Sequence, residues 1–212
     1  MTRVIAGAAG GRRLAVPGGN STRPTSDRAR EGLFGTVLSE LGDLGGVHVI
    51  DLYAGSGALG LEALSRGAAS VLLVESDTRA ASVVKANVKA LGLPGATVAV
   101  DKVERLLARP REERRHHRQG GYHLVFADPP YAVTDEAVSK MLALLDDGWL
   151  ADGALVVVER ATRSGPVHWP PGYTEGKSRR YGEATFWYGW YGNGAKVGQA
   201  ELAAGGRAGT VA

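Results

Sequence analysis

Four short apolar runs, each followed at once by a carboxylate, limit the fold of this chain more than any other feature. The runs are residues 47–50, 71–74, 96–100 and 122–127, and they precede Asp51, Glu75, Asp101 and Asp128. Segments with helical periodicity lie between them, and this alternation predicts an α/β fold with a doubly wound parallel sheet. The carboxyl ends of such strands line one edge of the sheet, where ligands bind. Because buried carboxylates are costly unless paired, the sequence predicts a ligand site at this edge.

The composition is that of a single soluble domain. The chain has 212 residues, of which 44% are hydrophobic and 22% are charged, so it is long enough to bury a substantial core. The absence of cysteine excludes disulfides, thiolate zinc sites and cysteine nucleophiles. The adjacent His116 and His117 have no third ligand at metal-binding spacing, so we expect no metal site. No segment has the length and apolarity of a membrane span or a secretory signal, and we therefore expect a cytoplasmic protein.

Residues 1–25 are predicted to form a β-hairpin extension. Two short strands, at residues 2–6 and 12–16, flank the glycine-rich residues 7–11. All charged side chains before Asp27 are basic, and they are Arg3, Arg12, Arg13 and Arg23. Because the excess for the whole chain is only +3, this local distribution is the better indication of an RNA-binding segment.

A helix is expected to follow the hairpin extension. Thr25 or Ser26 can cap its start, and apolar residues recur every fourth position as far as Leu41. Arg28 and Arg30 lie near the start, where positive charge opposes the helix dipole. This mild conflict indicates an anionic partner, although a solvated basic surface explains the same charges equally well.

The segment from Asp51 to Gly60 has glycines at positions 55, 57 and 60, the spacing of a dinucleotide-binding turn. A pyrophosphate at this turn would meet Asp51 with like charge. S-adenosylmethionine has no phosphate, and its ammonium suits Asp51, while Glu75 can accept from both ribose hydroxyls and Asp101 from the adenine amine. The backbone of Lys102 or Val103 can then meet the ring nitrogens. The predicted cofactor site comprises Asp51, Tyr53, Ala54, Gly55, Gly57, Glu75, Ser76, Asp101, Lys102, Val103 and Asp128.

The tetrapeptide Asp128-Pro129-Pro130-Tyr131 follows the fourth apolar run and has the groups needed to hold an exocyclic amine of a base. The Asp128 carboxylate and the Pro129 carbonyl can each accept one N–H of the amine. Tyr131 offers a flat face on which the base can stack. Holding the hydrogens out of the ring plane would free the nitrogen lone pair to attack an electrophile. The alternative is a simple strand-ending turn, because Asp-Pro and Pro-Pro are common in loops.

The second half of the chain is predicted to complete the sheet. A helix is expected at residues 135–145, a strand at 154–159, and a closing antiparallel pair at 174–178 and 184–190. The aromatic residues 186–191 are attributed to strand packing. The basic segment 109–118 is either an exposed connector or an RNA-binding patch, and the connector is favoured. We therefore divide the chain into the hairpin extension (1–25), one main domain (26–191) and a disordered glycine- and alanine-rich tail (192–212).

In these motifs the chain resembles the RsmD-type 16S rRNA guanine-N2 methyltransferases of bacteria. The resemblance rests on Arg3-Val4-Ile5-Ala6-Gly7, Gly11-Arg12-Arg13-Leu14, Thr22-Arg23-Pro24-Thr25-Ser26-Asp27-Arg28-Ala29-Arg30-Glu31, the glycine-rich turn, Asp128-Pro129-Pro130-Tyr131 and Arg180-Tyr181-Gly182. It covers about residues 3–191. The arginine-rich N-terminal segments are its more specific part, because many amino-methyltransferases share the other motifs. The basic segment 109–118 is longer than expected for the family.

The resemblance implies a Rossmann-like class I methyltransferase fold, with a mostly parallel seven-stranded sheet, an antiparallel C-terminal strand and an N-terminal β-hairpin. It implies S-adenosylmethionine as cofactor and methylation of a guanine N2 amine in 16S rRNA during 30S assembly, by a monomer. The predicted catalytic residues are Asp128, Pro129 and Tyr131, and the predicted RNA contacts are Arg3, Arg12, Arg13, Arg23, Thr25 and Arg28. Three alternatives remain open: an adenine-N6 methyltransferase, a Rossmann oxidoreductase that Asp51 argues against, and a non-catalytic RNA-binding assembly factor.

Overall fold

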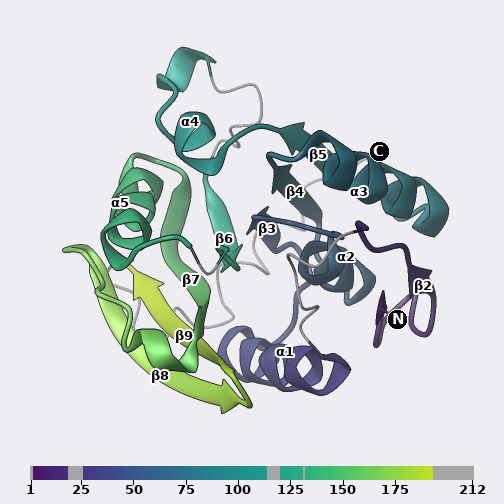
Figure 1. Cartoon of the computed structure of the whole chain (residues 1–212), viewed down its shortest axis with the longest axis horizontal. Helices are drawn as coiled ribbons and strands as arrows, with labels where there is room; N and C mark the ends of the chain where they lie inside the picture. The colour runs from purple at the N-terminus through teal and green to yellow at the C-terminus, as the bar shows by residue number, and fades with distance from the viewer. Residues whose placement is uncertain (1, 19–25, 114–119, 131, 193–212) are drawn as a thin grey trace, which may run out of the picture.

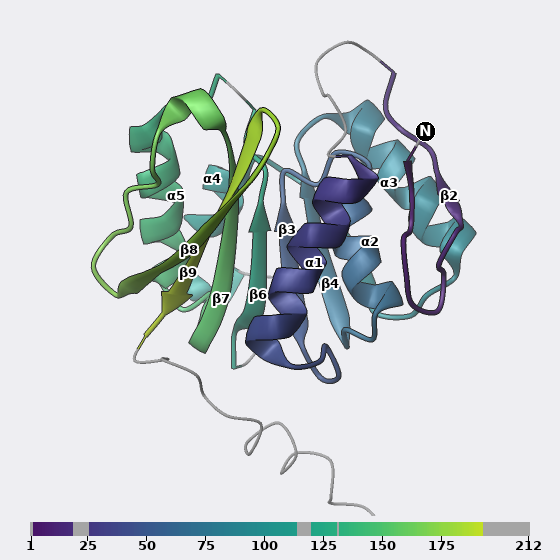
Figure 2. The same cartoon turned by 90° about the horizontal axis from the view of Figure 1, so that it is seen from below.

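A seven-stranded sheet forms the centre of the molecule (Figures 1 and 2). The computed structural model describes residues 2–18, 26–113, 120–130 and 132–192. The strands of the sheet are β3 (His48–Leu52), β4 (Ser70–Glu75), β5 (Ala96–Val100), β6 (Tyr122–Ala127), β7 (Leu150–Ala161), β8 (Tyr173–Tyr181) and β9 (Ala184–Tyr191). Their spatial order is β5-β4-β3-β6-β7-β9-β8, and only β9 runs against its neighbours. The predicted α/β fold with an antiparallel C-terminal strand is confirmed.

Helices cover both faces of the sheet, as Figure 2 shows. The helices are α1 (Asp27–Leu41), α2 (Ala58–Ser65), α3 (Thr78–Leu91), α4 (Val103–Leu107) and α5 (Asp135–Asp146), with short 3-10 turns at Arg111–Glu113 and Thr162–Ser164. Successive residues of a strand face opposite layers, so Val49 packs with α1, α2 and α3, whereas Ile50 packs with α4 and α5. Strands buried on both faces explain why the predicted strands are continuous apolar runs.

The helix ends follow from capping residues that the sequence supplies. Ser26 Oγ accepts from Ala29 N at 3.2 Å and caps α1, and Asp77 Oδ1 accepts from Ala80 N at 2.8 Å and caps α3. Gly92 ends α3 in the left-handed conformation, with φ of 65°. These predictions of helix ends are confirmed; the alternative cap, Thr25, lies outside the described residues.

The N-terminal hairpin is present, but its strands are shorter than predicted. They are β1 (Thr2–Arg3) and β2 (Arg13–Leu14), in place of the expected residues 2–6 and 12–16. Beyond β1 the backbone turns to α2, because Ile5 N and Ala6 N donate to the Glu62 carboxylate at 2.6 and 3.0 Å. The hairpin is therefore docked on the helices of the main domain (Figure 1).

Two predicted strand boundaries were wrong, because pairing with neighbouring strands extends both strands. Asp51 does not follow the first strand but lies within β3, because Leu52 continues the ladder opposite Val74 and Ala127. The strand β7 begins at Leu150 and not at residue 154, because Leu150 pairs with Tyr122 ahead of a register shift. Both ladders depend on neighbouring strands, which a local pattern does not specify.

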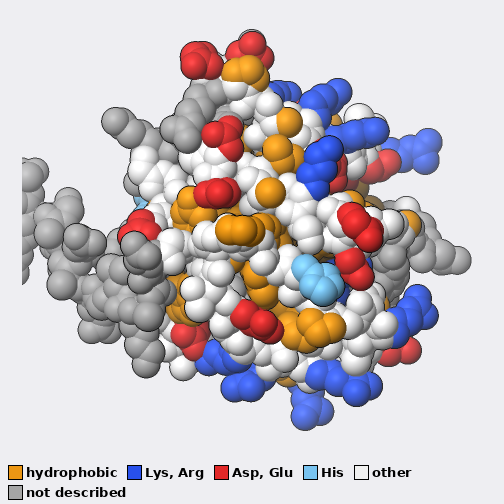
Figure 3. All heavy atoms as spheres, turned by 90° about the vertical axis from the view of Figure 1, so that its left-hand side faces the viewer, with side chains coloured by type: hydrophobic (Ala, Val, Ile, Leu, Met, Phe, Trp, Pro, Cys, Tyr) orange, Lys and Arg blue, Asp and Glu red, His pale blue; other side chains and the backbone are white. Residues whose placement is uncertain are grey.

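One outer edge of the sheet is the strand β8, which carries Lys177, Arg179 and Arg180. Charged side chains on an edge strand oppose pairing with another sheet. Figure 3 shows the side of the molecule around α5 and β8, where acidic and basic side chains are interspersed with hydrophobic ones. The predicted packing role of the aromatic residues is confirmed for Phe186 and Tyr188, which are buried.

No helix in the described part of the chain has the length and apolarity needed to cross a membrane. Residues 114–119 of the basic segment lie outside the described residues, and so does the predicted tail apart from Gly192.

Candidate active site

The carboxyl ends of the parallel strands lie along one side of the sheet, and the strand order changes direction at β3. The strands β4 and β5 lie on one side of β3, and β6 and β7 lie on the other. Such a switch point is where open α/β sheets bind ligands. Leu52 of β3 pairs with Ala127 of β6, so the next residues, Tyr53 and Asp128, leave the sheet as neighbours.

Residues 53–57, which we call the glycine loop, turn sharply between β3 and α2. Tyr53 has φ of 63° and is, among the described residues, the one non-glycine residue in the left-handed region. Gly55 and Gly57 have φ of 58° and 79°, conformations that favour glycine. A Cβ on Gly60 would lie 2.7 Å from side-chain atoms of Leu73 and Val71. The predicted glycine spacing thus provides a tight turn and close packing of α2 on β4.

Glu75 ends β4 and supports the glycine loop. Its Oε2 accepts from Gly55 N at 2.9 Å, and its Oε1 accepts from Asp77 N at 2.8 Å. The carboxylate is therefore fixed in place by the backbone on both sides. Because each carboxylate oxygen has a second lone pair, Glu75 can still accept from two hydroxyls of a ligand.

Asp101 follows β5 and is buried, with both of its oxygens in ion pairs. Oδ1 contacts Arg105 Nε, and Oδ2 contacts Arg109 Nη2. Oδ1 also accepts from Lys102 N at 2.8 Å. The first residue of the predicted connector, Arg109, thus helps to neutralise an acid at the edge.

Three acids meet around the switch point. Asp51 is 2% exposed, and burial raises its pKa to about 7, with Gly60 N, at 2.9 Å from Oδ2, acting against the rise and Glu75 adding to it. Asp128 is exposed, yet desolvation by the surrounding protein raises its pKa well above the ordinary value, and the negative charges of Glu159 and then Asp51 raise it further. Within the described residues, no donor forms a hydrogen bond with the Asp128 carboxylate.

Sequence reasoning missed Glu159, although it stands in the same kind of position as the acids that were found. The predicted strand 154–159 ends with this carboxylate, and β7 places it beside the switch point. The rule that acids at strand ends line the ligand site also predicts Glu159.

The segment after Asp128 is held by a buried arginine that sequence reasoning also missed. Arg160 Nη1 donates to Val133 O at 3.0 Å, and its Nη2 contacts Asp135 Oδ1 at 2.7 Å. Pro129 is buried, and Val133 N donates to Pro130 O at 2.9 Å. Tyr131 lies outside the described residues.

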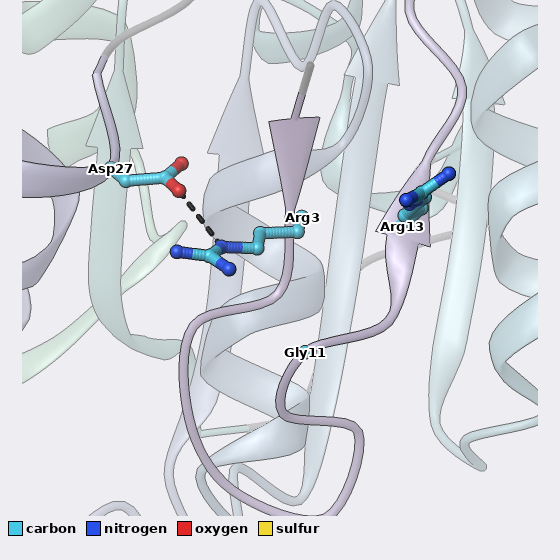
Figure 4. Close-up of a pocket in the computed structure, with 4 residues that line it drawn as sticks. All are labelled: Arg3, Gly11, Arg13 and Asp27. Carbon is cyan, nitrogen blue, oxygen red and sulfur yellow. Dashed lines mark hydrogen bonds and ion pairs between the residues drawn. The ribbon is translucent and has the colours of Figure 1, made fainter.

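The hairpin and the start of α1 enclose an open pocket of about 340 Å³. It is lined by Arg3, Gly11, Arg13 and Asp27. Figure 4 shows Arg3 extending from β1 toward Asp27, whereas Arg13 extends from β2 away from Arg3. Asp27 contacts Arg3 Nε at 2.9 Å and Arg30 Nη2 at 2.7 Å. Arg30 is 1% exposed, and its Nε and Nη1 have no hydrogen-bond partner among the described residues.

The structure distinguishes the predicted RNA contacts from one another. Arg3 and Arg13 line the open pocket, and Arg28 is exposed. Arg12 instead donates to the carbonyls of Leu91, at 2.8 Å, and Ala90 at the end of α3. Its guanidinium therefore caps a helix whose last carbonyls lack intrahelical partners. Arg23 and Thr25 lie outside the described residues.

A family model described as conserved hypothetical protein 95 matches residues 2–190. The chain belongs to this family. Among curated relatives, Ribosomal RNA small subunit methyltransferase D of Escherichia coli K12 is 36% identical over 173 residues, covering 79% of this chain and 80% of the relative. The protein of the same name from Haemophilus influenzae is 31% identical over 186 residues, covering 87% and 91%. The resemblance inferred from the motifs is confirmed, and the family member described here is a methyltransferase.

Solved structures agree with this membership. The Escherichia coli structure named Putative methyltransferase yhhF superimposes with a TM-score of 0.75 at 31% identity, covering 90% of this chain and 98% of that one. A further structure, SMU.776, a putative methyltransferase complexed with SAH, has a TM-score of 0.63 at 15% identity and covers 80% of this chain and 50% of that one. The second likeness concerns the fold alone. Both confirm the predicted methyltransferase fold class.

Proposed function

We propose that this family member transfers a methyl group from S-adenosylmethionine to the exocyclic N2 amine of a guanine in small-subunit ribosomal RNA, during 30S assembly. The observation that carries the proposal is the Asp128 carboxylate, which stands across the switch point from the glycine loop without a hydrogen bond from the described residues. An exocyclic amine would donate a hydrogen bond to this exposed carboxylate. The names of the relatives support ribosomal RNA as the substrate.

The acids at the carboxyl ends of the strands fit a cationic cofactor better than a dinucleotide. When bound, S-adenosylmethionine supplies a methyl group activated by a sulfonium, together with an ammonium. Glu75 is bonded to the glycine loop and presents a carboxylate, which would repel a pyrophosphate but attract these positive groups. Asp51 is buried two residues before the loop with a pKa of about 7, and its ionised form would add negative charge there. Glu75 retains lone pairs for the ribose hydroxyls. Asp101, already paired with Arg105 and Arg109, would accept from the adenine amine only with its remaining lone pairs.

Asp128 and Pro129 would hold the target amine, and Asp128 would accept its proton. One N–H would donate to the Asp128 carboxylate and the other to the Pro129 carbonyl, with Tyr131 stacking on the base. During methyl transfer from the bound cofactor, the nitrogen would gain positive charge, which Asp128 would stabilise. One proton then leaves the nitrogen, and the raised pKa of Asp128 makes this carboxylate a stronger base than an ordinary aspartate. Most of the rate would come from alignment, since no covalent enzyme intermediate is needed.

The RNA backbone would lie along the hairpin and the start of α1. Arg3 and Arg13 line the pocket of about 340 Å³ and Arg28 is exposed, which supports phosphate contacts by these three side chains. Arg23 and Thr25 remain predicted contacts. The active species would be a monomer acting in the cytoplasm, on free 16S rRNA or on a 30S assembly particle.

The test uses 16S rRNA and 30S particles from cells that lack the protein. Purified protein and S-adenosylmethionine should produce N2-methylguanosine at one position, detected by mass spectrometry of the digested RNA. N6-methyladenosine in its place would identify the adenine alternative. Cofactor binding without any methyl transfer to either substrate would favour the assembly factor.

The RNA contacts can be tested by the salt dependence of binding. Arg13→Ala should reduce the log–log salt slope by roughly one unit, because each phosphate contact contributes about one. Arg12→Ala should leave the slope unchanged, since Arg12 is engaged with Leu91 and Ala90. A wild-type slope in the Arg13 variant would exclude that side chain as a phosphate contact.

A further inference from the structure

One buried side chain touches both the hairpin and the glycine loop. Asn87 lies on α3 and is 3% exposed. Its Nδ2 donates to Ala15 O and to Ser56 O, both at 2.9 Å, and its Oδ1 accepts from Ala15 N at 2.9 Å. Both amide hydrogens are therefore used, one on each segment, and the acceptor holds the amide in this orientation.

The two segments that Asn87 joins have different proposed ligands. Ala15 lies two residues beyond Arg13, which lines the pocket proposed for an RNA phosphate. Ser56 lies between Gly55, which is bonded to Glu75, and Gly57 in the loop proposed for the cofactor. Asn87 thus contacts both the segment proposed for RNA and the loop proposed for the cofactor.

The helix α3 supports both segments at further points. A Cβ on Gly57 would lie 3.4 Å from Val84 Cγ1, so the glycine loop rests against the preceding turn of α3. At the other end of α3, the carbonyls of Leu91 and Ala90 accept from Arg12. The hairpin and the glycine loop therefore rest on one rigid element, and Asn87 bridges them directly.

We propose that Asn87 is a positioning residue that couples RNA binding at the hairpin to cofactor binding at the glycine loop. The proposal rests on the proposed function, because it takes RNA as the ligand of the hairpin. Asn87 touches neither ligand, and it acts through the backbone of Ala15 and Ser56.

The coupling follows from conformational freedom. Gly55 and Gly57 leave the glycine loop with many accessible backbone conformations, and the Asn87 amide fixes the direction of the Ser56 carbonyl between them. The amide is in turn fixed by the backbone of Ala15. A ligand that restrains the hairpin lowers the entropy lost when the cofactor orders the loop. By thermodynamic linkage, the cofactor must strengthen RNA binding by the same factor.

The experiment measures the affinity of S-adenosylhomocysteine, which cannot donate a methyl group, with and without saturating 16S rRNA from cells lacking the protein. For the wild type we expect about 5- to 50-fold tighter binding with RNA, within the usual range of coupling between two sites. RNA binding should tighten by the same factor when S-adenosylhomocysteine is saturating. A wild-type factor of one would overturn the proposal without any variant.

Asn87→Ala should bring the coupling factor close to one. It should also weaken S-adenosylhomocysteine alone by about 2- to 12-fold, the effect of one lost hydrogen bond that positions the loop. An unchanged coupling factor in a folded Asn87→Ala protein would overturn the proposal.

The matched control is Ser65→Ala on α2. Ser65 Oγ accepts from Ala9 N at 2.9 Å and donates to Ala6 O at 2.5 Å, so it holds the hairpin without touching the glycine loop. This variant should weaken RNA binding about as much as Asn87→Ala but retain the wild-type coupling factor. Loss of coupling in both variants would show that loosening of the hairpin is the cause, and would overturn the specific role of Asn87.

The proposed function fails separately from this inference. Absence of RNA binding or of methyl transfer in the wild type contradicts the proposed function. Methyl transfer with a coupling factor of one leaves the proposed function intact and overturns only the role of Asn87.

Discussion

Carboxylates on the two sides of the switch point have opposite surroundings. On the β4 and β5 side, Glu75 accepts from two backbone N–H groups and Asp101 is paired with Arg105 and Arg109. On the β6 and β7 side, no donor of the described residues reaches the Asp128 carboxylate, and its charged neighbours Glu159 and Asp51 are acids that raise its pKa.

The acids on the β4 and β5 side therefore have protein partners before any ligand binds, whereas Asp128 on the β6 and β7 side is left for a ligand to contact. The hydrogen bonds of Glu75 fix the glycine loop before any cofactor arrives, which limits the entropy lost on binding. No donor of the described residues uses the accepting capacity of the exposed Asp128 carboxylate, and a raised pKa is typical of catalytic groups. The predictions below test whether the two sides differ in function as they do in structure.

The largest effect is expected for Asp128→Ala. The variant should fold and bind S-adenosylhomocysteine nearly as well as the wild type, but lose about 10²–10⁴ in single-turnover methyl transfer. Its carboxylate would act on the amine as charge develops, so the loss should appear in the rate more than in binding. Full activity with saturating cofactor would show that Asp128-Pro129-Pro130-Tyr131 is only a strand-ending turn.

Asp128→Asn separates orientation from charge. The amide keeps an acceptor oxygen but can neither take the proton nor carry negative charge. If orientation dominates, Asn should retain much more single-turnover activity than Ala, and if charge dominates, the two variants should be similarly poor.

An intermediate effect is expected for Glu75→Ala on the β4 and β5 side. Calorimetry should show S-adenosylmethionine binding weakened by about 1–3 kcal/mol, from lost ribose contacts and from release of Gly55 N and Asp77 N. Glu75→Gln, which keeps one acceptor oxygen, should lose less. Unchanged affinity in the Ala variant would remove Glu75 from the cofactor site and end the contrast with Asp128.

The smallest effect concerns Asp51, which lies between the two sides. Its pKa is raised from 3.8 to about 7 in the folded chain, so folding favours the protonated form and the wild type loses stability as pH rises across this interval. Asp51→Asn can keep the bond from Gly60 N without ionising. The Tm of the variant should therefore exceed that of the wild type by more at pH 8 than at pH 5. Each kcal/mol of difference in unfolding free energy should shift the Tm by about 2–4 °C. An equal difference at both pH values would contradict the raised pKa.

Much of the candidate site could be predicted because its acids mark strand ends. Glu75 and Asp128 follow apolar runs directly, and a parallel sheet must bring such positions to one edge. Glu159 obeys the same rule and could have been found. The partners of these acids could not be predicted, because Arg105 and Arg109 contact Asp101 only after α4 folds back on the end of β5.

The two adjacent arginines of the hairpin show the same limit. Arg12 and Arg13 are equivalent in the sequence, yet one caps α3 and the other lines an open pocket. Arg12 precedes β2 and Arg13 begins it, so the docking of the hairpin on α3 decides which guanidinium meets the carbonyls of Leu91 and Ala90.

The sequence by itself determined the α/β alternation, the glycine turn, the helix caps and the family, because these depend on local chemistry and periodicity. Only the tertiary structure decided which carboxylates are satisfied by the protein, which arginine caps α3, and that Asn87 joins the hairpin to the glycine loop. Asn87 is separated by 72 residues from Ala15 and by 31 from Ser56. Contacts over such distances depend on the packing of α3 against two other segments, and no local pattern records it.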